Sequence, residues 1–247
     1  MNPGIRQGLA SGPPAKADIL LWLDARKGTT LTGSQVTNWA DQSGHGFDAN
    51  ATTITGMIPQ WPLLVASAMR GRPAVKISVG NSDGSDLIIG RQGMSPAWIP
   101  DSHNWCVGSA VRFLGRGGPV FLPSTVTDML VNTALGTVVE GSTQYAIASE
   151  SGFFNTAYSD SLVDYTNTSH TFVVNAASNA MDFQIDGASR PHGSFLASDM
   201  LGNGYTLGAK IGSAEPAFVL VGEVLVYDRS LTPTELSNLR AYLSGWV

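Results

Sequence analysis

One stretch near the C-terminus restricts the fold more than any other part of the chain. The run Val219–Asp228 is apolar on both of its alternating faces apart from Glu223. Successive side chains of a β-strand point to opposite faces, so a strand of this kind is stable only where protein covers both sides. The chain is therefore expected to place this strand in the middle of a layered domain.

Turn-forming residues recur along the chain and separate short segments with strand character. The chain has 28 Gly and 13 Pro, and this spacing of turns is typical of an all-β domain. In the clearest segment, Met181–Ile185, apolar and polar residues alternate, and Asp186-Gly187 then supplies a turn with positive φ. The other predicted strands are Ile19–Leu23, Ala74–Val79, Leu87–Ile89, Trp105–Phe113, Gln144–Ile147, Thr171–Val174 and Tyr205–Gly208.

A single helix is predicted, at the C-terminal end. Thr232 stands at the N-cap, Pro233 at the first helical position and Glu235 three residues beyond the cap, which together satisfy the free N–H groups of a first turn. The apolar residues that follow on one face are Leu236, Leu239 and Leu243. The helix is expected to end near residue 243 and to seal one edge of a β-sandwich.

The chain is expected to be one domain, residues 18–247, carried on an extended N-terminal arm. Residues 1–17 contain three Pro and three Gly and little that could be buried, which predicts a flexible segment that docks on a neighbouring protein. Beyond the arm we find neither an internal repeat nor a break in composition that would mark a second domain.

Charge and composition exclude several classes of partner. The net charge is −5 and no Lys/Arg run is present, so nucleic acid binding is not expected. No segment reaches the roughly 18 apolar residues of a membrane span. The start, Met1–Arg6, lacks the apolar core of a signal peptide, which predicts synthesis in a cytosol. The one cysteine, Cys106, lies in an apolar run and is expected to be a small buried hydrophobe.

Several motifs, taken in their order along the chain, resemble one family. Leu21–Ala25 and Val36–Ala49 combine a Trp, an Asp and a Ser-Gly-x-Gly turn, and Phe183–Gly187, Tyr205–Gly208 and Gly222–Thr232 match later strands. Together they resemble concanavalin A-like, laminin G-like domains over roughly residues 18–244. The resemblance implies a jelly-roll β-sandwich, a fold that hosts lectins, adhesion modules, glycosidases and virion proteins.

The carboxylates do not show the pattern that glycoside hydrolysis needs. That chemistry usually takes two carboxylates about 5–10 Å apart, and related glucanases place them at alternating positions of one strand. Glu223, one of five Glu, has apolar residues two positions away on either side. Asp182 and Asp186 share a strand face, but Gln184 separates them and solvation explains them. The sequence therefore predicts no catalytic residue and a protein that is not an enzyme.

Two Gly-rich stretches hold acidic residues that could bind Ca²⁺, which takes about six to eight oxygen ligands. Asp41 and Asp48 could supply oxygens from one loop, and Asp83 and Asp86 from another. Calcium at the sandwich rim is also what the family resemblance implies. The alternative is that Asp41 accepts hydrogen bonds from N–H groups of its own loop, with Trp39 filling the core beneath it. No other cofactor is expected, because the four His are isolated.

Two Trp residues stand beside turn and polar residues, as in carbohydrate sites. Trp61 precedes a Pro, and Trp98 is followed by Asp101, His103 and Asn104. An exposed aromatic platform with polar groups near it suits a sugar ring, so these five residues are the predicted glycan site. The alternative is that both Trp side chains anchor loops on the core, because Trp is highly buried on average.

Two classes of function remain. The first is a structural or attachment protein of a virus particle, specifically a bacteriophage: a capsid decoration, head fibre or tail-associated adhesin. The arm, the low charge and the lack of a signal peptide favour it. Its expected partners are other virion proteins, bound through the arm, and host-surface polysaccharide, with the chain forming a homo-oligomer or sitting in many copies on a scaffold. The second class is a freestanding lectin or carbohydrate-binding module, and a glycoside hydrolase is the least favoured.

Overall fold

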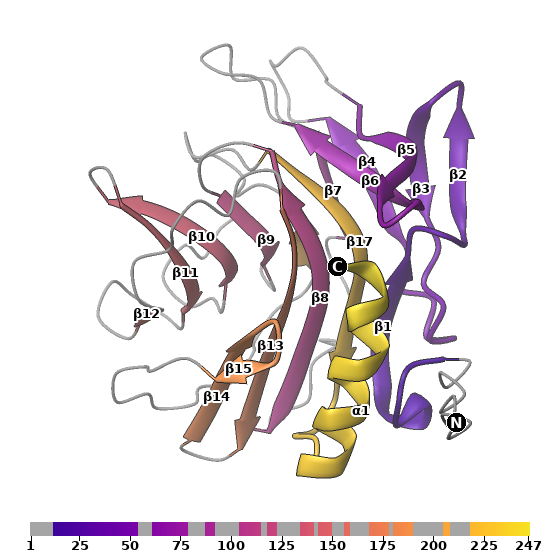
Figure 1. Cartoon of the computed structure of the whole chain (residues 1–247). Helices are drawn as coiled ribbons and strands as arrows, with labels where there is room; N and C mark the ends of the chain where they lie inside the picture. Colours follow the sequence, from indigo (N-terminus) through magenta and orange to yellow (C-terminus); the bar gives the residue numbers. More distant parts are fainter. Residues whose placement is uncertain are drawn as a thin grey trace, which may run out of the picture.

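The computed structural model describes residues 12–53, 61–78, 87–91, 104–114, 118–122, 134–140, 143–149, 156–158, 168–177, 180–189, 205–207 and 218–247. These residues form 17 strands, one α-helix and two short 3-10 helices (Figure 1). None of the helices in this part of the chain is long and apolar enough to cross a membrane.

The elements follow one another along the chain as η1 (Lys16–Asp18), β1 (Ile19–Asp24), β2 (Thr29–Thr32), β3 (Gln35–Trp39), β4 (Ala49–Thr53), β5 (Leu63–Met69), β6 (Arg72–Ser78), β7 (Leu87–Arg91), β8 (Trp105–Phe113), β9 (Gly118–Leu122), β10 (Ala134–Glu140), β11 (Thr143–Ser149), β12 (Thr156–Tyr158), β13 (Ser169–Ala177), β14 (Ala180–Ile185), β15 (Ala188–Ser189), β16 (Tyr205–Leu207), β17 (Phe218–Tyr227), α1 (Pro233–Leu243) and η2 (Ser244–Trp246).

The strands pair antiparallel in one continuous sheet of 17 strands, which folds over into the two layers of a β-sandwich (Figure 1). The first layer has the order β15-β14-β13-β8-β17, and the far edge of β17 pairs with β6 along its first half and with β1 along its second. The second layer has the order β12-β11-β10-β9-β16-β7-β4-β3-β2. Strand β5 pairs with β6 and, at Leu63, with Gln35 of β3. The all-β prediction is confirmed.

Strand β17 lies in the middle of the first layer, and both of its faces are covered. It pairs with β8 along nearly its whole length, and Val219–Tyr227 are all buried. The pairing register shifts at Gly222, directly before Glu223. The prediction of a strand covered on both sides is therefore confirmed. Cys106 of β8 is fully buried, and burial raises the pKa of its thiol, as expected of a structural cysteine.

Helix α1 begins and ends where the sequence predicted. The Glu235 N–H donates to Thr232 Oγ1 over 3.4 Å, and the Thr232 N–H donates to Glu235 Oε2 over 2.9 Å, which is a capping box. The prediction that the helix seals an edge is wrong. It lies across the face of β8, where a Cβ added to Gly108 would be 3.2 Å from both Leu239 and Leu243. Because β8 and β17 are apolar on both faces, the face turned away from the second layer needs this cover.

Strand β14 ends at the predicted Asp186-Gly187 turn, with φ of 52° and 79°, and this turn leads into the short strand β15. Phe183 of β14 is buried in the core, as the alternation predicted. The opposite face is not simply solvated, however. Gln184 is buried there because α1 covers it, and its Oε1 accepts a hydrogen bond of 2.6 Å from Arg240 Nε.

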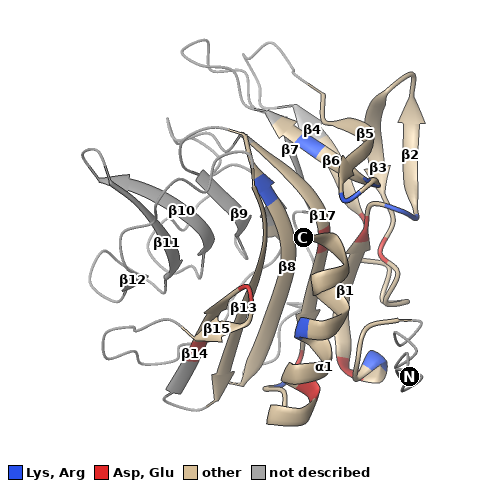
Figure 2. Cartoon of the chain, in the orientation of Figure 1, with Lys and Arg blue, Asp and Glu red and all other residues tan. Residues whose placement is uncertain are grey.

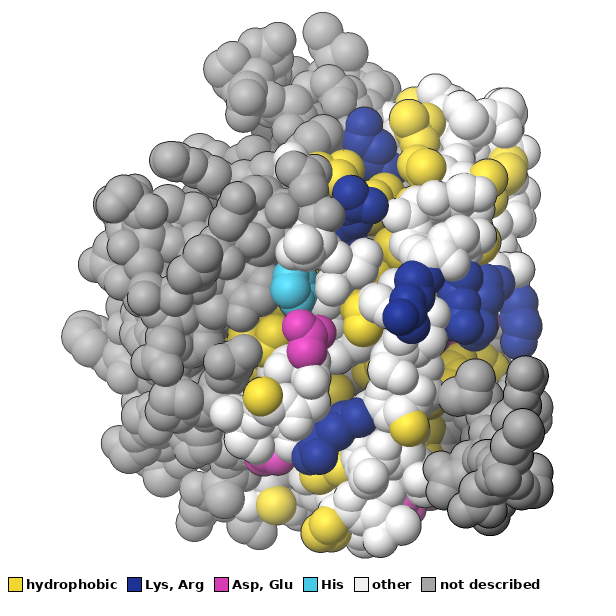
Figure 3. All heavy atoms as spheres, viewed as in Figure 1, with side chains coloured by type: hydrophobic (Ala, Val, Ile, Leu, Met, Phe, Trp, Pro, Cys, Tyr) yellow, Lys and Arg dark blue, Asp and Glu magenta, His cyan; other side chains and the backbone are white. Residues whose placement is uncertain are grey.

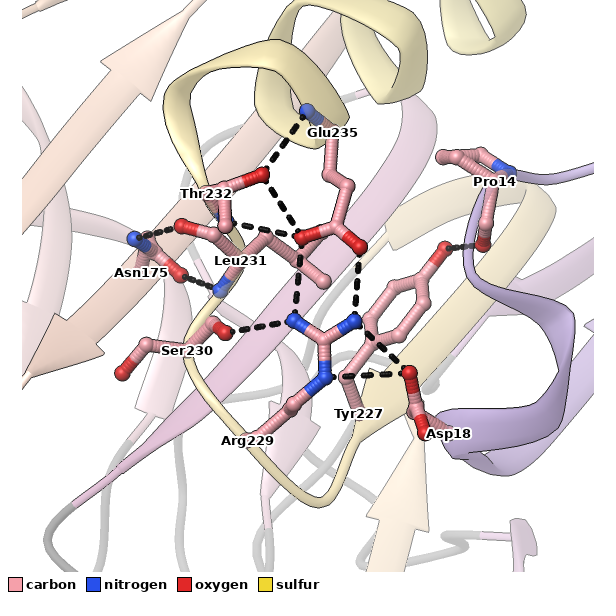
Figure 4. A network of polar contacts seen from close by, with 9 residues as sticks. All are labelled: Pro14, Asp18, Asn175, Tyr227, Arg229, Ser230, Leu231, Thr232 and Glu235. Carbon is pink, nitrogen blue, oxygen red and sulfur yellow. Dashed lines mark hydrogen bonds and ion pairs between the residues drawn. The ribbon is translucent and has the colours of Figure 1, made fainter.

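The last part of the predicted arm lies on the sandwich. Tyr227 donates its hydroxyl proton to the carbonyl oxygen of Pro14 over 3.1 Å (Figure 4). The Arg229 guanidinium binds Asp18 of η1 over 2.7 Å and Glu235 of α1 over 2.6 Å. The chain is thus fixed to the sandwich at Pro14 and at Asp18. Residues 1–11 lie outside the described residues, and docking through them stays a prediction.

Candidate functional site

The loop between β3 and β4, predicted as a candidate calcium site, is organised by the side chain of Asp41. Its Oδ1 accepts hydrogen bonds from the N–H groups of Trp22 and Ser43, over 3.0 and 2.9 Å. Its Oδ2 accepts from the Ser43 hydroxyl over 2.6 Å and from the Phe47 N–H over 3.1 Å. Asp48 Oδ1 accepts in turn from the Asp41 N–H over 2.9 Å. The loop is therefore held by carboxylates that accept from its own backbone.

These contacts fit the turn-stabilising alternative. Gly44 and Gly46 adopt positive φ of 98° and 72°, and Trp39 is fully buried, as that alternative predicted. Each oxygen of Asp41 already faces N–H or O–H donors, which a cation would have to displace, so this carboxylate does not fit a calcium ligand. Among the described residues no three His, Cys, Asp or Glu side chains gather where they could hold a metal ion. Asp83 and Asp86 lie outside the described residues, and calcium binding there stays a prediction.

Asp41→Ala is expected to lower the free energy of unfolding by about 2 kcal/mol, because three backbone N–H groups lose their acceptor in a half-buried loop. Asp41→Asn keeps one acceptor oxygen and should lose about half as much. Urea unfolding with and without EDTA measures both effects. A melting temperature that EDTA lowers in the wild type, but not in Asp41→Asn, would identify a calcium ligand instead.

The predicted glycan residues within the described chain do not lie together. Trp61 is half-buried directly before β5, whose Leu63 pairs with Lys76, and Lys76 pairs with Leu220 near the start of β17. Asn104 directly precedes β8, whose first strand residues lie beside the other end of β17. The stretch of β17 between these two ends, Leu220 to Tyr227, is about 23 Å long at roughly 3.3 Å per strand residue, so Trp61 and Asn104 do not share a site. Trp98, Asp101 and His103 lie outside the described residues, so that part of the prediction stays untested.

A buried polar cluster that the sequence did not reveal lies under the end of α1. We call it the Glu223 cluster. Glu223 Oε1 accepts hydrogen bonds from Trp22 Nε1 over 2.7 Å and from the Tyr242 hydroxyl over 2.6 Å. Its Oε2 accepts from Trp246 Nε1 over 2.6 Å. One carboxylate thereby connects β1, β17, α1 and η2.

A second carboxylate completes the Glu223 cluster. Asp24 pairs with Glu223 across β1 and β17 and is also fully buried. Arg26 covers both: its Nε and Nη2 each lie 2.7 Å from an Asp24 oxygen, and Nη2 lies 3.9 Å from Glu223 Oε2. The hydrogen bond to Asp24 raises the pKa of Arg26, while burial raises the pKa of Glu223. Two carboxylates sealed from solvent cannot reach a glycosidic bond, so the cluster holds the fold together.

A chain of hydrogen bonds at the β14–β15 turn has the order of a hydroxyl–imidazole–carboxylate relay. The Thr168 hydroxyl lies 2.6 Å from His170 Nε2, and His170 Nδ1 lies 2.7 Å from Asp186 Oδ2. Burial by itself raises the pKa of Asp186. The hydrogen bonds with His170 and with the Thr171 N–H together lower this pKa by more, so it lies below its ordinary value. The Thr171 N–H already donates to Asp186 over 2.8 Å, so it is not available as an oxyanion donor. The contacts instead fix the turn.

The chain is similar in fold to β-sandwich domains of known structure. One is domain 4 of AbnA, an extracellular arabinanase of Geobacillus stearothermophilus, in complex with arabinotriose: TM-score 0.59, 14% identity, 91% of this chain and 98% of that one. Trypanosoma rangeli sialidase gives a TM-score of 0.53 and 15% identity over 99% of this chain but 35% of its own. The binding domain of botulinum neurotoxin serotype G gives a TM-score of 0.51 and 17% identity over 90% of this chain and 50% of its own.

These similarities establish the fold and nothing finer. The chain spans about a third of the sialidase and half of the neurotoxin binding domain. With the pairing of strands described above, they confirm the predicted jelly-roll β-sandwich with a short C-terminal helix. No family model matches the chain. No curated protein matches it either.

Proposed function

We propose that this chain is a non-enzymatic attachment protein that binds glycans. One observation supports it most. The chain matches, over 91% of its length, the fold of an arabinanase domain in complex with arabinotriose, and the match covers 98% of that domain. In that structure the sandwich by itself is a unit that holds an oligosaccharide. The present chain has the same extent, so its size and fold suit the same task.

The contacts of four of the described carboxylates support binding without catalysis. Asp24 and Glu223 are buried in the Glu223 cluster, and Asp41 and Asp186 accept hydrogen bonds that order turns. A glycosidase needs two carboxyl groups on either side of the sugar bond, open to substrate. Each of these four carboxylates is instead committed to the fold.

The finer proposal is that the protein is mounted on a bacteriophage particle, as a capsid decoration, head fibre or tail-associated adhesin. The support is the way the N-terminal segment leaves the sandwich. Asp18 and Pro14 are fixed to Arg229 and Tyr227 beside the base of α1 (Figure 4), so the Pro- and Gly-rich residues before them start from a rigid point. A segment anchored in this way can order on a scaffold without a core of its own. Multiple copies on that scaffold would also raise avidity for weakly bound sugars.

The experiment is a glycan array followed by titration calorimetry with the full-length chain. We expect binding of at least one oligosaccharide class, lost on Trp98→Ala or Trp61→Ala, because each removes an aromatic platform. Val65→Ser, which changes an exposed apolar residue on β5, is the matched control and should bind normally. Absence of binding at millimolar sugar contradicts the proposal, and release of reducing ends from any bound glycan contradicts its non-enzymatic part.

The alternative is a freestanding lectin or carbohydrate-binding module. It keeps the glycan site but needs no scaffold. A chain lacking residues 1–11 decides between the two, because only the mounted protein loses incorporation into particles while keeping its affinity for sugar. Equal behaviour of the full and shortened chains in both assays favours the freestanding lectin.

A further inference from the structure

Five cationic side chains gather where three parts of the chain meet. Lys16 lies in η1, and Arg26 and Lys27 follow β1. Arg70 lies in the turn between β5 and β6, and Arg72 begins β6. Lys and Arg positions mark these segments near the end of α1 (Figure 2), and a row of Lys and Arg side chains is seen on this face of the molecule (Figure 3). We call these five residues the basic patch. Its presence contrasts with the net charge of −5 for the whole chain.

Two buried Trp rings organise the basic patch. The Lys16 and Lys27 amines lie 5.5 and 5.1 Å from the ring centroid of Trp22. Around the other ring, that of Trp246, the guanidinium carbons of Arg26 and Arg72 lie 5.0 and 5.3 Å from the centroid. Each ring is thus within cation–π distance of two cations, which limits the freedom of their side chains. A set of cations held in place loses less entropy when it binds an anion than a set of free surface chains does.

The negative charge near the basic patch lies underneath it. Asp24 and Glu223 are both fully buried, and Arg26 and Lys27 lie over Asp24, with nitrogen–oxygen distances of 2.7 and 3.9 Å. The exposed part of this region is therefore cationic. Within the described chain, Arg70 and Arg72 have no carboxylate partner, although Arg70 Nη1 donates to the Ser244 carbonyl oxygen over 3.1 Å. The Lys27 amine pairs with Asp24 over 3.9 Å, but the Lys27 side chain is 53% exposed. These groups keep further N–H donors for a ligand.

The backbone conformation at Arg70 is a separate indication that a cationic side chain has a role at this position. Arg70 has φ of 47° and Gly71 has φ of 75°, so the β5–β6 turn is left-handed at both central positions. Asn, Asp or Gly would adopt that conformation with less strain than Arg. Strained positions of this kind are often retained for function.

We infer that the basic patch binds an anionic saccharide polymer, one that carries carboxylate or phosphate groups. This inference rests on the proposed glycan-binding function and names the class of glycan. Guanidinium groups suit both anions, because their planar donors match paired oxygens. A short anionic stretch can sit on the patch while the rest of the polymer extends away from the acidic remainder of the protein. A long nucleic acid would lie along that acidic surface and be repelled by it.

The test uses the full-length chain and four probes: polygalacturonate, a glycerol-phosphate polymer, neutral arabinan and duplex DNA. Titration calorimetry at about 50 mM and about 300 mM NaCl separates charge-dependent binding from the rest. Lys27→Ser/Arg70→Asn removes two cations. Asn relieves the turn, which offsets the loss of the Lys27–Asp24 ion pair and of the hydrogen bond from Arg70 to the Ser244 carbonyl, so the melting temperature should change little. Lys27→Arg/Arg70→Lys keeps the charge and is the matched control.

We expect one of the two anionic saccharides to bind, salt to weaken it, and the Ser/Asn variant to lose about tenfold in affinity while the Arg/Lys variant does not. Which of the two anionic polymers binds shows whether the basic patch recognises carboxylate or phosphate groups. Binding of arabinan alone, unchanged in the Ser/Asn variant, overturns the inference and leaves the proposed function standing. DNA bound as tightly as the saccharides also overturns it. Binding of no saccharide at all, here or on the array, overturns the proposed function as well.

Discussion

Glu223→Ala is expected to lower the free energy of unfolding by about 4 kcal/mol. The substitution removes the acceptor shared by Trp22 Nε1, Trp246 Nε1 and the Tyr242 hydroxyl, all within 2.7 Å of the carboxylate. The two indole donors are buried, so water cannot replace the lost partner at low cost. The loss should appear in urea unfolding as a lower midpoint with an unchanged slope.

Two milder variants show whether the acceptor is what matters. Glu223→Gln keeps an oxygen for Trp22 and Tyr242 but turns its NH₂ toward the Trp246 N–H, so we expect a loss of about 2 kcal/mol. Tyr242→Phe removes one donor at the solvent side of the cluster and should lose about 1 kcal/mol. Equal stability of the Ala and Gln variants would contradict the acceptor role and leave only packing.

The pH dependence of the stability difference between the wild type and Glu223→Gln gives an independent test. Burial raises the pKa of Glu223 above its ordinary value of 4.5, outweighing the hydrogen bonds that favour the charged form. The folded state then holds this proton more tightly than the unfolded state does. Its contribution to stability is therefore full below about pH 4.5 and is lost as pH rises through the folded pKa. The advantage of the wild type over Glu223→Gln should be largest near pH 4 and shrink toward pH 7. An advantage that grows with pH would contradict the raised pKa.

The sequence predicted those features whose causes are local. The capping box of Thr232 and Glu235 contains its own hydrogen-bonding partners, and the Asp186-Gly187 turn needs only two residues that tolerate positive φ. The double-sided apolar character of Val219–Tyr227 required cover on both faces, whatever supplied it. Asp41 also followed this rule, because most of its donors stand in the same loop. Local sequence signals were therefore enough to predict the all-β class, the C-terminal helix and the loop that Asp41 organises.

Features built from distant segments could not be predicted in this way. Glu223 looked like an isolated acid because its partners, Trp22 and Trp246, stand 201 and 23 residues away. Gln184 looked solvated because nothing in its strand showed that α1 would cover it. The helix was assigned to an edge for the same reason: only the packing of Leu239 on Gly108 shows that it lies on a face. The predicted glycan site depended on loops, and a sequence pattern alone does not tell where a loop lies in the fold.

Gly222→Ala is expected to lower the free energy of unfolding by about 3 kcal/mol, although it adds a single methyl group. A Cβ at this position would lie 2.6 Å from Cε3 and 2.8 Å from Cζ3 of Trp246. Trp246 is fully buried and its Nε1 is bound to Glu223, so the ring cannot move without breaking that bond. Gly222 does not need positive φ, so the loss would come from the clash and not from backbone strain.

Gly108→Ala is the matched control, because it adds the same methyl group to the neighbouring strand. Its Cβ would lie 3.2 Å from the ends of Leu239 and Leu243, which can rotate away, so we expect a loss of less than about 1 kcal/mol. A double variant then isolates the clash. Trp246→Leu alone should cost about 3 kcal/mol through lost packing, but adding Gly222→Ala to it should cost much less than Gly222→Ala costs in the wild type. Additive losses, measured by urea unfolding of all four proteins, would show that the contact between Gly222 and the Trp246 ring does not hold the C-terminus in place.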